Sequence, residues 1–364
     1  MSDALQIIVL CGGLSSEREV SLRSGKAVSE VLPGARFVEL AADALPEWLD
    51  AARHVVFPVL HGGWGEDGRA QAEMEARGVA FAGCASAPSG VPTKLPVAEH
   101  APAGLRIEQG ADSLGSEVRK VPVQALILHH TGGNLAGSYD VLQGRKSSHR
   151  VGIHYLVTDE NPPRIIAMVP ETKVAYHAGK SGWRQFDGLN QPSIGIEIIN
   201  LDGNIHRYPA AQQELVAKLC ADILRRHPSI KLTEVLAHSD IAIGRKIDPG
   251  LLFPWAEFAA RGIGAWPLQA DVDAFLKSSA QVEATEVRRL LLTYGYAVEA
   301  GESGLKLAIE AFQRHFRGKK VDGVADAETV AILRALVKRY RVGATAPSPA
   351  PATPRPAKNA KLKP

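Results

Sequence analysis

The sequence VPVQALILHHT, residues 121–131, decides the fold of the central part of the chain. Four apolar residues in a row, Ala125 to Leu128, are followed directly by His129, His130 and a threonine. A short apolar run with polar residues at its end is typical of a buried strand. Because neighbouring side chains of a strand point to opposite faces, His129 and His130 cannot both enter one site. We therefore expect one of them to be a ligand and the other to be a packing or supporting residue.

Further elements follow this strand. Residues 153–158, 165–169 and 194–199 are additional strand candidates, and residues 211–226 have apolar residues at helical spacing. Together with residues 121–131 they predict an α/β domain, which we place at residues 119–268.

The first 96 residues predict a separate, small parallel α/β domain. Apolar runs at residues 5–10 and 55–60 are each followed by a glycine pair, and a segment of helical spacing, residues 17–32, lies between them. A strand, a glycine turn, a helix and a second strand are the start of a parallel sheet. Residues 97–118 are rich in Ala, Pro, Gly and Ser without a sustained period, so we expect a linker there.

After the central domain, residues 277–340 predict a small, independent module of three short helices. We expect its core to contain Leu290, Leu291, Phe312 and Phe316. In residues 341–364, proline alternates with Ala, Ser, Thr and Lys, a composition that predicts a disordered tail.

The charge of the chain excludes one class of function. Its 42 Lys and Arg residues against 39 Asp and Glu residues give a formal net charge of +3. Five of the basic residues and no acidic one lie in residues 341–364, so residues 1–340 hold two more acidic than basic residues. A nucleic-acid-binding core would show a basic face within its folded part. We therefore expect no nucleic-acid partner.

Cysteine usage and the apolar runs bear on the compartment. The three cysteines lie far apart and form no C-x-x-C pair, which excludes a disulfide framework. The sequence shows neither a signal peptide pattern nor a membrane span, so we expect a cytoplasmic protein. Its oligomeric state is unknown from the sequence.

Histidines concentrate in the central domain, where eight of the twelve fall between His129 and His238. A catalytic zinc takes three protein ligands from His, Asp or Glu and leaves one position open. Two histidines and one aspartate from separate places would satisfy it, and a nearby glutamate would take a proton from water. The alternative is that these are scattered surface and core histidines, and spacing alone leaves both interpretations open.

Residues 121–267 resemble the zinc-dependent N-acetylmuramoyl-L-alanine amidases of the AmpD and AmiD type. The matching strings, in the order of the family, are LILHHT, SHRVGIHYLV, VAYHAG, SIGIEI, LAHSDIAIGRKIDPG and LFPWAEFAARGIGAWP. The resemblance implies a mixed-sheet zinc amidase domain. It also implies Zn²⁺ as the cofactor and hydrolysis of the amide bond between N-acetylmuramic acid and L-alanine in peptidoglycan or muropeptides, in cell-wall turnover or recycling.

The resemblance also implies roles for individual residues. Glu197 matches the glutamate that activates water, and Lys246 matches the lysine that stabilises the oxyanion. His154 and His177 stand where family members also carry histidine, and either could line the substrate cleft or have a structural role. The residues that match the zinc ligands are His129, His238 and Asp248.

The two flanking segments resemble other proteins of cell-wall metabolism. Residues 277–340, with LLTYGY, AIEAFQRHF and VDGVADAET, resemble the three-helix peptidoglycan-binding module of wall hydrolases, which holds an enzyme on its polymer. Residues 1–96, with GGLSSEREVSLRSG and VLHGGWGEDGRAQAEMEARGVAFAG, resemble the N-terminal domain of D-alanine–D-alanine ligase. There, Glu17 and His61 would stand beside the first D-alanine.

The ligase resemblance stops near residue 95, before the ATP-grasp portion that ligation requires. We therefore expect no ligation and no use of ATP. The segment is then a remnant, a folding or docking partner, or a sensor of D-alanine.

Two functions from different classes compete for the central domain. One is a zinc amidohydrolase that acts on peptidoglycan or its fragments, and the other is a protein that binds muropeptides without cutting them. Because a non-catalytic member would be expected to lose a ligand, the complete ligand set together with Glu197 and Lys246 favours catalysis.

Overall fold

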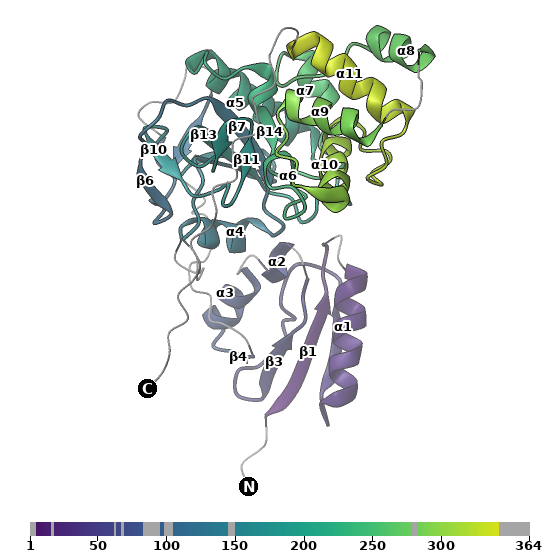
Figure 1. The fold of residues 1–364 in the computed structure, drawn as a ribbon. Coiled ribbons are helices and arrows are strands. Elements are labelled where there is room, and N and C mark those ends of the chain that lie inside the picture. The colour runs from purple at the N-terminus through teal and green to yellow at the C-terminus, as the bar shows by residue number, and fades with distance from the viewer. Residues whose placement is uncertain are drawn as a thin grey trace, which may run out of the picture.

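The computed structural model describes residues 5–15, 18–61, 63–66, 69–82, 95–97, 105–144, 150–278 and 283–341 of the chain. The first unit is a four-stranded sheet in the order β2-β1-β3-β4, and its neighbouring strands run parallel, as predicted. Figure 1 labels β1, β3 and β4 of this sheet. Its elements are β1 (Gln6–Gly12), α1 (Arg18–Val31), β2 (Arg36–Leu40), β3 (His54–Pro58), α2 (Gly63–Glu66), α3 (Arg69–Ala76) and β4 (Ala80–Phe81).

The central unit is built on a six-stranded sheet in the order β14-β7-β13-β8-β9-β5. Only the β8–β9 pair is antiparallel among these strands, so the sheet is mixed. The strands are β5 (Ile107–Gln109), β7 (Ala125–His130), β8 (Tyr155–Val157), β9 (Ile165–Ala167), β13 (Ser193–Ile198) and β14 (Val235–Ala237).

The alternation of side chains along β7 places one set on each face of this sheet. Leu126 and Leu128 pack in a cluster with residues of the long helix α5 (Ala210–Arg226), whereas Ala125 and Ile127 pack in a different cluster on the opposite face. Both clusters are buried, which explains why the strand sequence is apolar throughout rather than alternating.

The prediction of a linker at residues 97–118 is wrong for the part that the structure describes from residue 105 onward. Strand β5 pairs with β9 in the main sheet, and β6 (Ser116–Val118) pairs with β10 (Lys173–Ala175). These three-residue strands are too short to give a period in the sequence, and a charged residue interrupts the first of them. Glu108 on β5 is buried and accepts a hydrogen bond of 3.0 Å from the Arg164 guanidinium, which makes this polar segment a part of the fold.

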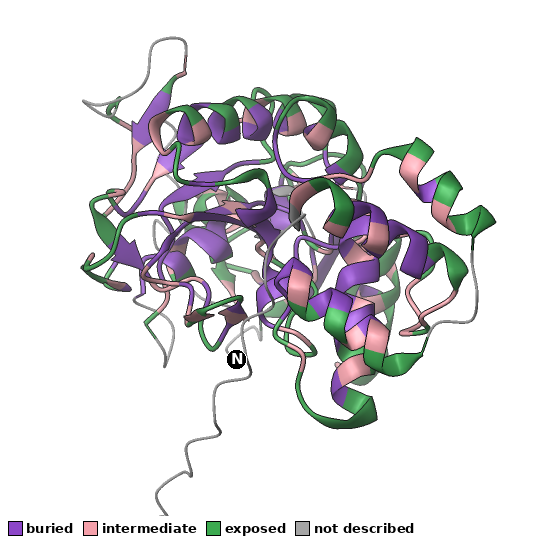
Figure 2. Ribbon diagram, turned by 45° about the horizontal axis from the view of Figure 1, so that its top comes forward, coloured by how far each residue is buried: buried purple, intermediate pink, exposed green. Residues whose placement is uncertain are grey.

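The C-terminal unit consists of α8 (Gln269–Lys277), α9 (Ala284–Tyr294), α10 (Gly301–Phe316) and α11 (Ala327–Arg341). The last three are the predicted helices, and α8, which lies almost wholly before residue 277, packs against α11 as a fourth. In Figure 2 these helices carry buried residues on their inward sides and exposed residues outside. Leu290, Leu291, Phe312 and Phe316 are buried, as predicted.

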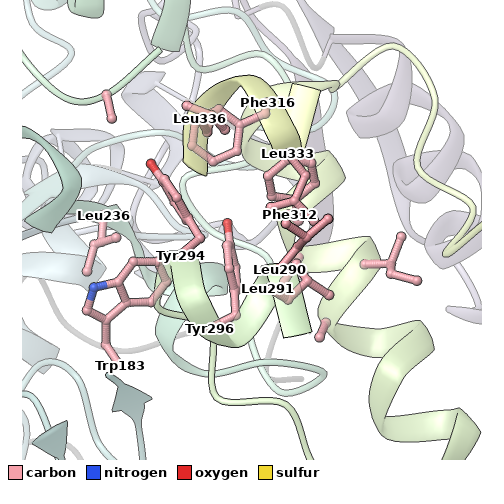
Figure 3. Packing of buried hydrophobic residues seen from close by; sticks show 14 of the residues in the cluster. Trp183, Leu236, Leu290, Leu291, Tyr294, Tyr296, Phe312, Phe316, Leu333 and Leu336 are labelled. Carbon is pink, nitrogen blue, oxygen red and sulfur yellow. The ribbon is translucent and has the colours of Figure 1, made fainter. Parts of the chain in front are cut away.

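This helical unit is not independent of the central one, contrary to our expectation. One buried cluster joins Trp183 and Leu236 of the central unit to Tyr294 and Tyr296 of the helical unit (Figure 3). Gly295 allows the close approach, since a Cβ atom there would lie 2.7 Å from atoms of the Trp183 ring. The two units therefore share a core.

Shorter elements complete the structure. Those that matter for the site are α4 (Leu135–Leu142), β11 (Gly182–Trp183), β12 (Phe186–Asp187), α6 (His238–Ile241) and α7 (Trp255–Ala260). Within the described ranges, no helix combines the length and apolar character needed to cross a membrane. The tail predicted at residues 341–364 lies outside the described residues except for its first residue.

Candidate active site

The site lies where three neighbouring parallel strands end. Strand β7 carries His129 near its carboxyl end, and the parallel register pairs this residue with Glu197 on β13. Strand β14, on the other side of β7, leads directly into α6, whose first residue is His238. Carboxyl ends of parallel strands are where ligands bind in open α/β sheets.

Three donor atoms converge there. The Nδ1 atoms of His129 and His238 are 2.9 Å apart, and Asp248 Oδ2 lies 3.1 Å and 3.0 Å from them. All three residues are buried, and they form the group of described residues that could hold a metal ion. Zinc with bonds of about 2.0–2.1 Å needs tetrahedral donors about 3.3 Å apart, so a small outward shift accommodates it.

The hydrogen bonds of the Nε2 atoms of His129 and His238 determine which nitrogen of each ring carries the proton. His238 Nε2 donates to the Ala178 carbonyl oxygen at 3.2 Å. His177 lies between His129 Nε2, at 2.9 Å from its Nδ1, and Ser193 Oγ, at 3.1 Å from its Nε2. The Ser193 hydroxyl donates to the Leu189 carbonyl, so it accepts from His177 Nε2–H, and His177 Nδ1 accepts from His129 Nε2–H.

This assignment leaves both Nδ1 atoms without protons. Two nitrogen lone pairs and a carboxylate oxygen then face one another, an arrangement that repels unless a cation lies among them. Burial lowers the pKa of His129 to about 4, so its ring is neutral, and His238 adds to the shift. The donor set therefore fits a metal ion.

Glu197 is the candidate general base of this site. Its side chain is partly buried, and its Oε2 atom is covered and has no hydrogen-bond partner among the described residues. Burial, reinforced by the charge of Asp248, raises the pKa of Glu197 well above its ordinary value, while Lys246 works to lower it. A carboxyl group of this kind can both take and return a proton near neutral pH.

Two of the three donor residues, His238 and Asp248, line a cavity of about 580 Å³ together with Glu197. Glu197, His238, Lys246 and Asp248 form one part of its wall, and the residues around the start of α4 form another. Lys246 is exposed and follows α6 on the loop that leads to Asp248. Further lining residues are Thr131, Gly133, Asn134, Ser138, Tyr176 and Leu201.

The two adjacent histidines divide their roles as the strand geometry predicted. His129 joins the donor set, whereas His130 Nδ1 lies 3.0 Å from the Pro249 carbonyl oxygen. Tyr208 donates to the same carbonyl at 2.6 Å. These two residues hold the backbone directly after Asp248.

The interpretation of His154 as a substrate-binding residue is wrong. Its side chain is fully buried, its Nδ1 accepts from the Gly195 amide at 3.0 Å, and its Nε2 lies 3.2 Å from the Lys173 carbonyl oxygen. It does not line the cavity. Burial, with the charge of Arg119 adding to it, lowers its pKa to about 3, which agrees with a neutral structural histidine.

His177 does line the cavity, and the structure gives it a second contact that sequence reasoning missed, with the ring of His129. Gly195 makes room for it, because a Cβ atom there would lie 2.6 Å from His177 Cγ. The signal in the sequence was the glycine inside the strand SIGIEI, which marks the close approach of another group.

The proposed D-alanine residues belong to the first unit. Glu17 lies outside the described residues. His61 follows β3, and its backbone carbonyl accepts a hydrogen bond of 2.5 Å from the Ser15 hydroxyl. Their suggested role stays a prediction.

Comparison with known proteins gives two family matches. Residues 119–251 match the family model described as N-acetylmuramoyl-L-alanine amidase, and residues 281–333 match one described as a peptidoglycan binding domain. The N-acetylmuramoyl-L-alanine amidase AmiD of Escherichia coli is 38% identical over 235 residues, which are 60% of this chain and 83% of AmiD.

A solved structure and a ligase are also similar. AmiD from E. coli, in complex with the substrate anhydro-N-acetylmuramic acid-L-Ala-D-γ-Glu-L-Lys, aligns with a TM-score of 0.55 at 38% identity and covers 60% of this chain and 90% of AmiD. The D-alanine–D-alanine ligase of Anaplasma centrale is 37% identical over 110 residues, which are 29% of this chain and 54% of the ligase.

Proposed function

The chain belongs to the N-acetylmuramoyl-L-alanine amidase family, and from this premise we propose that it cuts its substrate with one zinc ion held by His129, His238 and Asp248. The bond is the amide between the lactyl group of N-acetylmuramic acid and the L-alanine of a stem peptide. The observation that carries the proposal is the convergence of three buried donor atoms, 2.9–3.1 Å apart, beside a cavity that His238, Asp248, Glu197 and Lys246 line.

Zinc bound by these three residues would supply a Lewis acid that polarises the scissile carbonyl and makes water nucleophilic near neutral pH. The protein supplies the rest. The hydrogen bonds from His129 to His177 and from His238 to Ala178 fix both imidazoles with Nδ1 toward the ion.

Glu197 takes the proton from the attacking water and returns it to the departing amine of L-alanine. Its raised pKa suits both steps, because the carboxyl group must hold the proton between them. The oxygen of water forms a bond to the lactyl carbonyl carbon, the carbon–nitrogen bond breaks, and the free amino group leaves with the stem peptide.

Lys246 stabilises the negative charge that develops on the carbonyl oxygen. Its side chain is exposed at the cavity wall, where it can reach a substrate that fills the cavity. Closure of the substrate over the cavity would bring this charge beside the oxyanion, where loss of one such donor typically costs up to about 3 kcal/mol.

The substrate class is peptidoglycan and its soluble fragments. AmiD, to which 60% of this chain aligns, was solved with an anhydro-muramyl tripeptide. The match of residues 281–333 to a peptidoglycan binding domain supports action on polymer, because a second contact with the wall raises the local concentration of scissile bonds.

For the first unit we propose a role without ligation. The similarity to the Anaplasma ligase spans 110 residues, about half of that enzyme, and residues 119–251 match the amidase family instead. A remnant, a docking partner and a D-alanine sensor are the candidates. Calorimetric titration with D-alanine and D-Ala-D-Ala tests the sensor, and the absence of heat would remove it.

Mass spectrometry of a muropeptide digest tests the activity itself. Anhydro-N-acetylmuramic acid-L-Ala-D-γ-Glu-L-Lys should give the free tripeptide and anhydro-N-acetylmuramic acid, and the Glu197→Gln variant should give neither. Cleavage at another bond would contradict the proposal. Tight binding of an intact muropeptide by zinc-loaded wild type would instead show a binding protein.

A further inference from the structure

The metal ligand His238 is connected to the helical unit through Asp240. The Asp240 side chain is fully buried, and two donors from the helical unit reach it. The Tyr296 hydroxyl donates to Oδ1 at 2.8 Å, and His315 Nδ1–H donates to Oδ2 at 2.7 Å. Tyr296 follows α9 and His315 lies near the end of α10, so both come from the region around the peptidoglycan binding domain match.

Asp240 also stabilises the first turn of α6, which carries the metal ligand His238. Its Oδ2 accepts a hydrogen bond of 2.8 Å from the Ala237 amide, the last residue of β14, so it closes the first turn of α6 from inside. His238 is the first residue of that helix. The Ser239 amide donates to the Asp248 carbonyl oxygen at 3.0 Å, which ties a second ligand to the same turn.

The two donors are themselves fixed by packing. The His315 ring stacks on Trp255 with centroids 3.9 Å apart, and it stacks on Phe316 at 4.1 Å. The Tyr296 ring packs edge-on against Trp183 at 4.9 Å. Side chains held in this way present their donors in one position, which is what preorganisation of a site requires.

A buried carboxylate needs such partners. An ionised carboxyl group without water is destabilising unless hydrogen bonds compensate it, and losing one partner leaves it poorly satisfied. Asp240 would then move toward other donors, and the turn with His238 would move with it. Nothing in the wall-binding role of the helical unit requires these contacts.

We propose that Tyr296 and His315 are positioning residues for the metal centre, which they hold in place through Asp240. The helical unit thus has a second task besides any contact with polymer, because it completes the support of His238 and Asp248. This inference rests on the proposed zinc site. According to this inference, residues of the helical unit as well as residues of the central unit hold the metal ligands in place.

Three variants of the full chain test it. Tyr296→Phe and His315→Phe remove one donor each and keep the aromatic packing. Tyr340→Phe is the matched control, because it removes a hydroxyl that bonds the Trp266 carbonyl between the two units and is not one of the donors to Asp240. Each protein is measured for its zinc dissociation constant by chelator competition, for the visible absorption of its cobalt-loaded form, and for its urea midpoint.

We expect Tyr296→Phe and His315→Phe to weaken zinc binding about tenfold each, the scale of lost support around metal ligands. The cobalt spectrum should shift, since it reports ligand geometry, and kcat should fall with KM nearly unchanged. Tyr340→Phe should leave zinc affinity and spectrum as in the wild type. If His315→Phe does not fold, Tyr296→Phe, which loses a single oxygen, carries the test.

Two results would overturn the inference. If both variants keep wild-type zinc affinity and cobalt spectrum while their urea midpoints fall like that of Tyr340→Phe, the contacts are merely structural. If the wild type binds no zinc, the proposed function fails and the inference fails with it. The wild-type measurement therefore separates the two failures.

Discussion

Glu197 on β13 lies directly opposite His129 on β7 in the parallel register, so the two side chains project from the same face of the sheet. The same face of β13 carries Gly195 and Ser193, which accommodate and bind His177. The base Glu197, the ligand His129 and the two residues that hold His177 therefore come from two adjacent strands. The rigid sheet fixes their separations, which a loop would do less well.

The first prediction concerns Glu197. In Glu197→Gln, the amide cannot take a proton from water, so we expect kcat/KM for muropeptide cleavage to fall by roughly 10²–10⁴-fold. The metal donors are untouched, so zinc content by atomic emission should match the wild type. Near-normal activity of this variant would mean that another group is the base.

Gly195→Ala should weaken zinc binding indirectly, by displacing His177 from the ligand His129. Its new methyl group would lie 2.6 Å from His177 Cγ and 2.7 Å from Ile153 Cδ1, so both side chains must move. Overpacking of this kind costs about 1–3 kcal/mol, measurable by urea unfolding, and zinc affinity should fall as His177 leaves His129.

Gly137→Ala is the control for this substitution, because its methyl group meets only the Asn134 side-chain oxygen, at 3.3 Å. It should keep the wild-type zinc affinity. Equal zinc affinity in Gly195→Ala and Gly137→Ala would show that His177 does not support the ligand.

Acid stability should depend on Glu171. Burial works to raise the pKa of this carboxyl group, but hydrogen bonds from His227, Arg226 and Tyr155 outweigh it and hold the pKa at about 2, below the ordinary 4.5. A lowered folded-state pKa stabilises the protein above pH 4.5, and this contribution is lost as the pH falls from 4.5 to about 2.

A shift of this size corresponds to about 3 kcal/mol. Glu171→Gln should therefore be less stable at pH 7 by about that amount and should lose less on acidification, as followed by urea unfolding at several pH values. Glu160→Gln, which removes an exposed partner of Arg164, should change stability by less than about 1 kcal/mol. Parallel pH profiles of Glu171→Gln and wild type would contradict this account.

The central and helical units should unfold together. Trp183, Tyr294 and Tyr296 are buried in one cluster that spans both, so exposing either unit alone would expose the shared core. Calorimetry should show one transition for the two. Trp183→Ala should cost about 3–5 kcal/mol and lower that single transition. Two separate transitions for these units would show that the contact is too weak to couple them.

Part of this site could be predicted from the sequence, because several of its residues lie close together in short motifs. His129 lies at the end of a recognisable strand, and His238 and Asp248 lie ten residues apart in one motif. Residue type and spacing alone leave scattered histidines as an alternative, so the three individual donors are predicted only by the resemblance to the amidase family. The direction in which a side chain points could not be predicted from such a motif. His154 was proposed for the cleft, but it points into the interior, where Gly195 and Lys173 bind it.

The contacts between units could not be predicted. Tyr296 and Asp240 are 56 residues apart in sequence, and His315 and Asp240 are 75 apart, and no periodic pattern connects such positions. The sequence predicts three helices within residues 277–340, but the apolar face of a helix does not show which part of the chain covers it. Strands β5 and β6 were missed because three residues do not make a period.

Titration of zinc into metal-free protein, with bound zinc and muropeptide cleavage followed together, tests the central claim most directly. We predict that cleavage rises in proportion to bound zinc and levels off at one ion per chain. Glu197→Gln should bind the same amount without cleavage, and Asp248→Asn should bind much more weakly. Full cleavage by metal-free wild type in excess chelator, or tight zinc binding that survives the loss of both His129 and His238, would contradict the account.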